Sequence, residues 1–196
     1  MVIEPIVLEG DAAKIEPLKI EHLDELFEAA SDESLWLWTV NVVKSKDDLR
    51  RYVETALDEQ TRKSSLPFVT IDKNSNKIVG STRFGNIDSK NRRAEIGWTW
   101  INSKWQRTAI NTEVKFLMLK HAFESWNCIR VELKTDALNS KSRNAILRLG
   151  AKEEGTLRQH MITETGRFRD SVYFSIIDSE WKIVKAGLEA KLEKYR

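Results

Sequence analysis

The chain has 196 residues, 41% of them hydrophobic and 32% charged, and its 32 Lys and Arg residues nearly balance its 30 Asp and Glu residues, for a net charge of +2. This length and apolar content suffice for one ordinary hydrophobic core, which excludes wholesale disorder and predicts a single domain over residues 1–196. The two signs of charge are interleaved along the chain, without the basic excess typical of nucleic-acid-binding proteins.

The cysteine content and the N-terminal residues indicate in which cellular compartment the protein lies. The single cysteine, Cys128, cannot form an internal disulfide or a cysteine-rich metal site, and the three histidines lie far apart, so we expect no metal. The first nine residues lack the basic start and long apolar run of a signal peptide. No stretch approaches the roughly 18 to 20 uncharged residues of a membrane-spanning helix. We therefore expect a soluble, cytoplasmic protein that does not bind membranes.

The apolar pattern switches between period two and helical period and predicts an alternating series of strands and helices. In chain order these are strand 13–18, helices 19–30 and 47–57, strands 67–71, 77–86 and 93–101, helix 111–126, strand 129–135, helix 140–149, strands 156–163 and 168–177, and a helix from about 179 to 194. Short turns join the three middle strands, which favours an antiparallel meander. The helix at 111–126 is apolar all round and should be buried against a sheet.

The junction between strand 93–101 and the buried helix is the first candidate site. A helix N-terminus presents unpaired backbone N–H groups and the positive end of the helix dipole, so a turn that wraps it suits a phosphate or pyrophosphate. Lys104 and Arg107 add two cations to this turn. The alternative is a plain loop that enters a core helix capped by Asn111. These residues alone leave both interpretations open.

Four segments together resemble one family. They are Glu95–Ile101, Gln106–Asn111, Leu117–Phe123 and Asn139–Gly155. In these segments the chain resembles the GNAT N-acetyltransferase superfamily, in its RimJ/RimL-like branch of ribosomal-protein N-acetyltransferases. The resemblance spans nearly the whole chain. It implies an α+β (mixed α/β) GNAT acyl-CoA N-acyltransferase fold, with a central mixed, mostly antiparallel sheet of about seven strands flanked by helices.

The resemblance also implies acetyl-CoA (coenzyme A) as co-substrate. In the family the turn amides hold the pyrophosphate, and the preceding strand splays from its neighbour and pairs with the pantetheine arm. The positions that correspond here are Trp100, Ile101, Gln106, Arg107, Thr108, Ala109, Ile110, Asn111 and Thr112, with Asn139 and Ser142 near the sulfur end. Ala109 and Asn111 replace family glycines, which predicts a bulkier turn, and Glu113 should point away from a phosphate. Helix capping is the alternative role for Asn139 and Ser142.

Acetyl transfer in the family needs a proton donor for the departing thiolate and a base for the amine. Many members place a tyrosine where Ile146 stands, so the hydroxyls of Ser142 and Tyr173 are the remaining donors. Glu95 and His160 are the candidates for a base or a holder of water. The alternatives are a solvated strand carboxylate for Glu95 and an exposed or hydrogen-bonded histidine for His160.

The function predicted from this resemblance is an acetyl-CoA-dependent N-acetyltransferase that acts directly on a primary amine, either a protein N-terminus or a small molecule. The alternative is a GNAT-fold module that binds acyl-CoA without turnover, because two glycines and a tyrosine of the family are replaced. A third reading is an RNA-associated protein, although no direct contact with nucleic acid is expected. The acceptor site should lie around Trp36, Trp38, His160 and the segment Arg167–Tyr173. A homodimer would cover exposed sheet edges.

Overall fold

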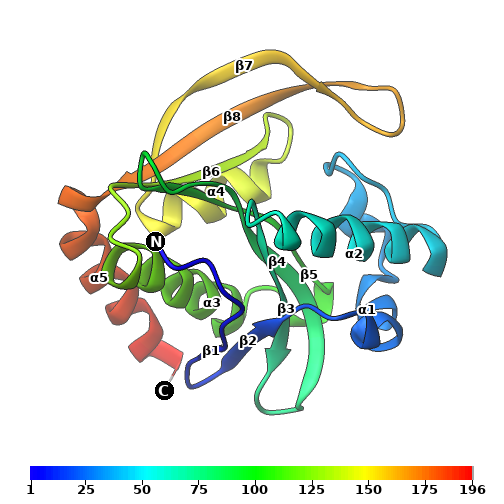
Figure 1. Ribbon diagram of the computed structural model, residues 1–196, viewed down its shortest axis with the longest axis horizontal. Coiled ribbons are helices and arrows are strands. Elements are labelled where there is room, and N and C mark those ends of the chain that lie inside the picture. Colours follow the sequence, from blue (N-terminus) through cyan, green and yellow to red (C-terminus); the bar gives the residue numbers. More distant parts are fainter. Residues whose placement is uncertain (196) are drawn as a thin grey trace.

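Figure 1 shows the computed structural model of the chain, which describes residues 1–195. One sheet of eight strands runs through this part of the chain, in the order β1-β2-β3-β4-β5-β6-β8-β7. The strands are β1 (Leu8–Glu9), β2 (Ala13–Pro17), β3 (Leu66–Asp72), β4 (Lys77–Asp88), β5 (Arg93–Ile101), β6 (Arg130–Asp136), β7 (Lys152–Ile162) and β8 (Phe168–Ile177). The α-helices are α1 (Leu23–Ala30), α2 (Lys46–Thr61), α3 (Ala109–Lys120), α4 (Ser140–Leu149) and α5 (Asp178–Leu192).

The predicted strands and helices all form, in the predicted order. The additional strand is β1, which has two residues and pairs with β2. A strand this short has no apolar period to detect. One strand boundary was wrong by four residues, because β7 begins at Lys152 and not at 156. Its side chains are exposed almost throughout, so no buried stripe marks where it starts.

Thr108 caps α3, which places the helix start two residues before the predicted one. The Thr108 backbone is extended, and its Oγ1 accepts a hydrogen bond from the Ile110 N–H at 3.4 Å. Threonine is a favoured N-cap because its hydroxyl supplies a partner that the first amides of a helix lack. Asn111 therefore lies inside the first turn of α3, and the expectation that it caps the helix is wrong.

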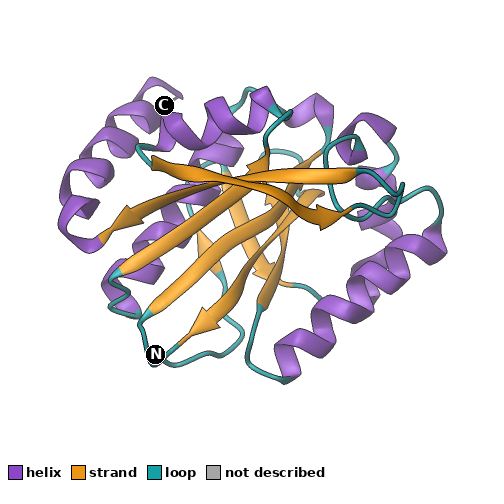
Figure 2. Cartoon of the chain, turned by 90° about the horizontal axis from the view of Figure 1, so that it is seen from above, coloured by secondary structure: helices purple, strands orange, loops and turns teal. Residues whose placement is uncertain are grey.

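Helices cover both faces of the sheet (Figure 2). One core lies between the sheet and α3, α4 and α5, and it contains Val114 and Met118 of α3. A second core lies between the sheet and α1 and α2, and it contains Leu26 and Leu49. The helix α3 is thus buried, as its all-round apolar sequence predicted. Within residues 1–195, no helix combines the length and apolar character needed to cross a membrane.

Strands β3, β4 and β5 form the predicted antiparallel meander, whereas β5 and β6 are parallel and pair only briefly. Their pairing is limited to Arg93–Glu95 with Arg130–Glu132. Beyond these residues β5 continues to Ile101 beside β4, and β6 continues to Asp136 beside β8. The two strands therefore diverge in the middle of the sheet, and the facing edges of both lose their ladder partners.

A β-bulge interrupts β5 in the diverging part. The pairing with β4 places two residues, Trp98 and Thr99, opposite a single residue of β4. Trp98 has a φ of 48°, in the left-handed region that a bulge residue can adopt. After the bulge, Trp100 enters the core beneath α1 and α2, where its ring lies 5.3 Å from the ring of Trp36. Because of the bulge, the side chains at the end of β5 lie on the opposite face of the sheet from the one that a regular strand would give them.

Candidate active site

The turn that joins β5 to α3 is pinned by hydrogen bonds on both sides. Gln106 Nε2 donates to the Ile101 carbonyl at 2.9 Å, and Thr108 Oγ1 donates to the Trp105 carbonyl at 2.8 Å. Arg107 lies between them, exposed, with a φ of 62°. The turn therefore has a fixed shape at a helix N-terminus, where the helix dipole favours an anion.

The two positions at which the family has glycine do not require glycine here. Among residues 106–112, Arg107 alone has a positive φ, while Ala109 and Asn111 lie in the first helical turn of α3. A helical backbone is accessible to any residue, so the replacements introduce no strain into the turn. The observed turn thus fits the phosphate-binding role that the sequence predicts for it.

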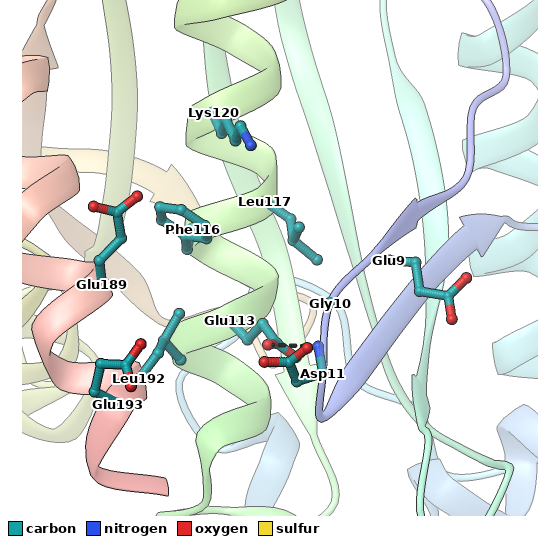
Figure 3. Close-up of a pocket in the computed structure, with 10 residues that line it drawn as sticks. All are labelled: Glu9, Gly10, Asp11, Glu113, Phe116, Leu117, Lys120, Glu189, Leu192 and Glu193. Carbon is teal, nitrogen blue, oxygen red and sulfur yellow. Dashed lines mark hydrogen bonds between the residues drawn. The ribbon is translucent and has the colours of Figure 1, made fainter. Parts of the chain in front are cut away.

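Glu113 is held to one side of α3, by the turn between β1 and β2. Its carboxylate accepts hydrogen bonds from the N–H groups of Asp11, Ala12 and Ala13, at 2.9, 2.7 and 2.7 Å. Figure 3 shows the contact between Glu113 and Asp11. Both residues line a cavity of about 430 Å³ beside α3 and α5, which none of the predicted site residues lines. The negative charge of Glu113 is therefore engaged by three N–H groups, as expected for a carboxylate that does not face an anion site.

Asn139 and Ser142 lie at the start of α4, which follows β6. Asn139 Oδ1 accepts a hydrogen bond from the Ser142 N–H at 3.0 Å, so Asn139 caps this helix. Ile146, at the position of the family's tyrosine, is buried in the core. The helix ends where predicted, at Leu149, and the next residue, Gly150, has a φ of 101° in the left-handed region. Asn139 and Ser142 thus flank the β6 side of the divergence. Asn139 has the expected capping role, whereas Ser142 lies inside α4 and supplies the N–H that is capped.

Glu95 is a buried carboxylate in the middle of the sheet. Its neighbours on both sides along β5 belong to the α3 core, so its own side chain lies on the opposite face. Oε2 accepts a hydrogen bond from Asn86 Nδ2 at 2.7 Å and lies 3.0 Å from Lys134 Nζ. Oε1 lies beside Gly97, where an added Cβ would approach it to 2.9 Å. The alternative of a solvated strand carboxylate is wrong, because the Glu95 side chain is only 3% exposed.

Lys134 connects Glu95 to two aromatic side chains. Its Nζ lies 5.7 Å from the centre of the Trp98 ring and 5.8 Å from the centre of the Tyr173 ring, within the range of a cation–π contact. Tyr173 is the residue opposite Lys134 across the β6–β8 ladder, and the His160 ring meets it edge-on at 5.7 Å. The structure therefore brings three predicted catalytic residues, Glu95, Tyr173 and His160, into one connected group.

The fourth predicted catalytic residue stands apart from this group. Within residues 1–195, no hydrogen bond or ring contact joins Ser142 to Glu95, Tyr173 or His160. His160 instead has Ser171 as its polar partner, with 3.0 Å between Nδ1 and Oγ. Ser142 therefore belongs with the start of α4 rather than with the buried carboxylate.

Trp98 closes the group on the side of α2. An added Cβ on Gly85 would lie 2.3 Å from the Trp98 ring, so the ring rests directly on β4. The guanidinium carbon of Arg83 lies 4.9 Å from the ring centres of both Trp98 and Tyr52. Arg83 also forms an ion pair of 2.9 Å with Glu59 of α2. Aromatic and guanidinium groups thus enclose one side of the buried carboxylate.

Sequence reasoning missed Lys134 and the neighbouring Asp136 of β6. Four charged residues alternate along this strand, Arg130, Glu132, Lys134 and Asp136. The alternation was visible, but a charged strand face is usually read as solvated. The missing information was which element covers that face.

An acetyltransferase (GNAT) domain model matches residues 14–152 of the chain. The chain belongs to the GNAT acetyltransferase family. The match runs from β2 to the first residue of β7 and confirms the predicted fold. It includes the turn before α3 and Glu95, whereas His160 and Tyr173 lie beyond it. The part of the chain that matches the family model therefore includes the diverging strands β5 and β6. It does not include the β7–β8 hairpin beyond Lys152.

Relatives of this GNAT protein are themselves named as acetyltransferases. It is 33% identical over 105 residues to "Putative ribosomal N-acetyltransferase YdaF" of Bacillus subtilis, a match that spans 54% of this chain and 56% of that protein. It is 23% identical over 176 residues to the ribosomal-protein-serine acetyltransferase of Escherichia coli, which spans 87% of this chain and 96% of that protein.

A solved structure agrees with these relatives. The crystal structure of a GCN5-related N-acetyltransferase from Brucella melitensis, 32% identical, superposes with a TM-score of 0.89 over 96% of this chain and 86% of that chain. This GNAT protein is accordingly an N-acetyltransferase, in a family that uses acetyl-CoA generally. The alternative of a module without turnover is not favoured.

Proposed function

We propose that this GNAT protein binds acetyl-CoA where β5 and β6 diverge and transfers the acetyl group directly to a primary amine. The observation that carries the proposal is the three-residue pairing of these strands beside the pinned turn at the start of α3. Free strand edges offer N–H and C=O partners to an extended, amide-containing chain, and a helix start offers N–H groups to a pyrophosphate. Bound acetyl-CoA supplies an acetyl group that is activated as a thioester.

The residues proposed to hold acetyl-CoA come from three elements that border the divergence. The end of β5, the turn before α3 and the start of α4 supply them, and the exposed cations Lys104 and Arg107 add favourable charge for a phosphate. They are Trp100, Ile101, Gln106, Arg107, Thr108, Ala109, Ile110, Asn111, Thr112, Asn139 and Ser142.

Glu95 is the proposed base. A primary amine is protonated at neutral pH and must lose a proton before it attacks a carbonyl. Because Asn86 and Lys134 both bind Oε2, the other oxygen of Glu95 is left to accept that proton through a water. The bulge at Trp98 places a residue of β5 outside the ladder, and its N–H is a suitable donor to an acyl oxygen. The hydroxyl of Tyr173, whose ring contacts Lys134, is the proposed proton donor to a departing thiolate.

Two residues are second candidates for the same roles. His160 is the alternative base, and its hydrogen bond with Ser171 would orient the imidazole. Ser142 is the alternative proton donor, from the start of α4. The kcat values of Glu95→Gln and His160→Gln distinguish the two candidate bases. The kcat values of Tyr173→Phe and Ser142→Ala distinguish the two candidate proton donors. Loss of the true base or donor should lower kcat by about 10² to 10⁴-fold while acetyl-CoA binding is retained.

The acceptor that we propose is a protein N-terminus. The names of the Bacillus subtilis and Escherichia coli relatives refer to ribosomal-protein acetylation, which supports this substrate class. A small-molecule amine is the second candidate, because the fold alone does not select an acceptor. The cytoplasmic location and the homodimer stay predictions of the sequence.

A calorimetric titration with acetyl-CoA tests the proposed site. We expect micromolar binding by the wild type and a loss of about tenfold or more in Arg107→Glu, because a carboxylate at the turn repels a phosphate. Lys182→Glu is the matched control, since it makes the same change of charge at an exposed position of α5. No binding by the wild type, or equal losses in both variants, would contradict the proposal.

A further inference from the structure

Asp136, at the end of β6, is shared by two arginines. The Arg167 guanidinium forms an ion pair with Asp136 Oδ2, and Arg169 Nε lies 4.0 Å from the same oxygen. The Asp136 side chain is completely buried, and the Arg169 side chain is 9% exposed. One buried carboxylate therefore faces two guanidinium groups.

The Arg169 guanidinium is not satisfied by the part of the chain that the structure describes. Its Nε is buried and makes no hydrogen bond there. A separation of 4.0 Å from Asp136 is too long for a hydrogen bond, although it is an electrostatic contact. Arginine has five N–H donors arranged for planar acceptors such as carboxylates, and a buried polar group is normally hydrogen-bonded. Burial also lowers the pKa of Arg169, because desolvation disfavours its charged form.

The charges around Arg169 leave one cation in excess. On this face of the sheet, Lys134 is paired with Glu95 and Arg167 with Asp136. In the part of the chain that the structure describes, these two carboxylates face three cations, and Arg169 shares Asp136 with Arg167 instead of having a carboxylate of its own. A negatively charged group supplied by a ligand would neutralise the excess and fill the open donor positions.

Arg169 lies on the same side of β8 as the candidate catalytic residues. Side chains two and four residues apart on a strand share a face, which places Arg169 in a row with Ser171 and Tyr173. Ser171 contacts His160, and Tyr173 contacts Lys134. The unsatisfied guanidinium is therefore a neighbour of the group that is proposed to act on the amine.

The tip of the β7–β8 hairpin closes this region from the side of α2, and Figure 1 shows the hairpin reaching across the sheet toward that side. Glu164, in the tip, accepts hydrogen bonds from Asn41 Nδ2 at 2.9 Å and from the Val42 N–H at 2.7 Å. Arg167 lies 5.5 Å from the centre of the Trp38 ring. The loop between α1 and α2 and the hairpin tip thus form one wall, next to Arg167 and Arg169.

We propose that Arg169, assisted by Arg167, binds a carboxylate of the acceptor, so that the enzyme selects amines that carry a carboxylate close to the reacting nitrogen. The inference rests on the proposed function, since it assigns a substrate class to the same site. Two sources share this chemistry. One is an acidic side chain near a peptide N-terminus, and the other is the α-carboxylate of a free amino acid.

Binding measurements on matched ligands test the inference without requiring turnover. The protein saturated with coenzyme A is titrated with the peptides Ser-Asp-Ala-Ala and Ser-Asn-Ala-Ala, both amidated, and with serine and serinamide. We expect the carboxylate-bearing member of one pair to bind about tenfold more tightly than its neutral partner. The peptide pair and the amino-acid pair distinguish the two sources. Equal binding within both pairs would overturn the inference.

Variants connect the preference to Arg169. Arg169→Met should abolish the preference for the carboxylate-bearing ligand over its neutral partner, whereas Arg169→Lys should retain part of the preference. Arg158→Met removes an exposed arginine of the adjacent strand β7 and should leave the preference intact. A preference that survives Arg169→Met, or is lost equally in Arg158→Met, would also overturn the inference. Thermal unfolding of each variant verifies that it folds.

The two proposals fail in different measurements. A wild type that does not bind acetyl-CoA contradicts the proposed function. A wild type that binds acetyl-CoA and acetylates the neutral peptide as rapidly as the acidic one retains the proposed function and contradicts only the carboxylate site. With the acidic peptide, a rise in KM in Arg169→Met at nearly constant kcat would assign Arg169 to acceptor binding rather than to the chemical step.

Discussion

Lys115 of α3 is a buried lysine whose hydrogen-bond partners are hydroxyl groups. The residue is 5% exposed, and its Nζ donates to Thr82 and Thr99. Burial lowers the pKa of Lys115 from 10.5 to about 7, because the apolar core disfavours the ammonium form. Removal of this charge should therefore change the stability of the protein and the way in which stability depends on pH.

The sign follows from the lowered pKa. Below pH 7 the folded and unfolded chains both carry the Lys115 proton, and the full desolvation penalty opposes folding. Between pH 7 and pH 10.5 the folded chain has lost a proton that the unfolded chain keeps, so this contribution to stability rises with pH. The pKa of Lys115 falls from 10.5 to about 7. At about 1.4 kcal/mol for each unit of pKa, this corresponds to a desolvation penalty of about 5 kcal/mol. Because the folded chain releases the Lys115 proton in this range, about 2 kcal/mol of the penalty is regained between pH 7 and pH 9.

Lys115→Met removes the charge and keeps an unbranched side chain. Thr82 and Thr99 still have each other as partners, because their hydroxyl oxygens are 2.7 Å apart. After the lost hydrogen bonds of the ammonium are subtracted, we expect the variant to be about 2 kcal/mol more stable than the wild type at pH 7. This advantage should shrink by about 2 kcal/mol at pH 9, where the wild-type lysine is neutral in the folded chain.

Urea unfolding of both proteins at pH 7, 8 and 9, followed by tryptophan fluorescence, measures the difference. Lys120→Met is the control, since it makes the same substitution at an exposed position of α3. The control should show no comparable dependence on pH. A variant less stable than the wild type at pH 7, or a stability difference that stays constant up to pH 9, would refute the reasoning.

Three glycine substitutions test how local packing and backbone conformation determine stability. Gly85→Ala should lower the free energy of unfolding by about 1 to 3 kcal/mol, because its Cβ would lie 2.3 Å from the Trp98 ring. Gly150→Ala should lower it by about 1 kcal/mol or more, since the φ of 101° disfavours a side chain and the Cβ would lie 3.1 Å from Val184. Gly187→Ala, in α5 with no atom within 4 Å, should raise it by up to about 1 kcal/mol. Urea unfolding measures all three, and a change of the same sign at Gly150 and Gly187 would contradict the argument.

Most elements of the fold could be predicted because they have a local apolar period, which β1 and the start of β7 lack. The helix at α3 was predicted to be buried from its composition, and the predicted end of the helix 140–149 agrees with the end of α4 at Leu149. The start of α3 was misplaced, because both Thr108 and Asn111 are good capping residues. The sequence does not show which of these two residues caps the helix. The extended backbone of Thr108 in the structure shows that Thr108 does.

The turn proposed to bind acetyl-CoA could also be located from the sequence, since it is a continuous strand–turn–helix segment. Two of its features could not be anticipated. The positive φ falls on Arg107 rather than at the replaced glycines, and the bulge at Trp98 inserts a residue into β5. Both depend on how the segment is anchored, through Gln106 to Ile101 and through β5 to β4.

The sequence predicted an acceptor site around Arg167–Tyr173. It did not predict the parts of Lys134 and Asp136, because the contacts on this side join residues that are far apart in the chain. Glu164 reaches the α1–α2 loop across 122 residues, and Arg167 reaches Asp136 across 31. The sheet order β6-β8-β7 places Tyr173 opposite Lys134, a pairing that no local pattern specifies. Once the hairpin tip and α2 cover that face, charged residues that resemble a solvated strand become a buried network. In such a network each charge needs a partner. Within residues 1–195 the Arg169 guanidinium makes no hydrogen bond and shares Asp136 with Arg167, and this open position indicates the charge that the proposed substrate brings.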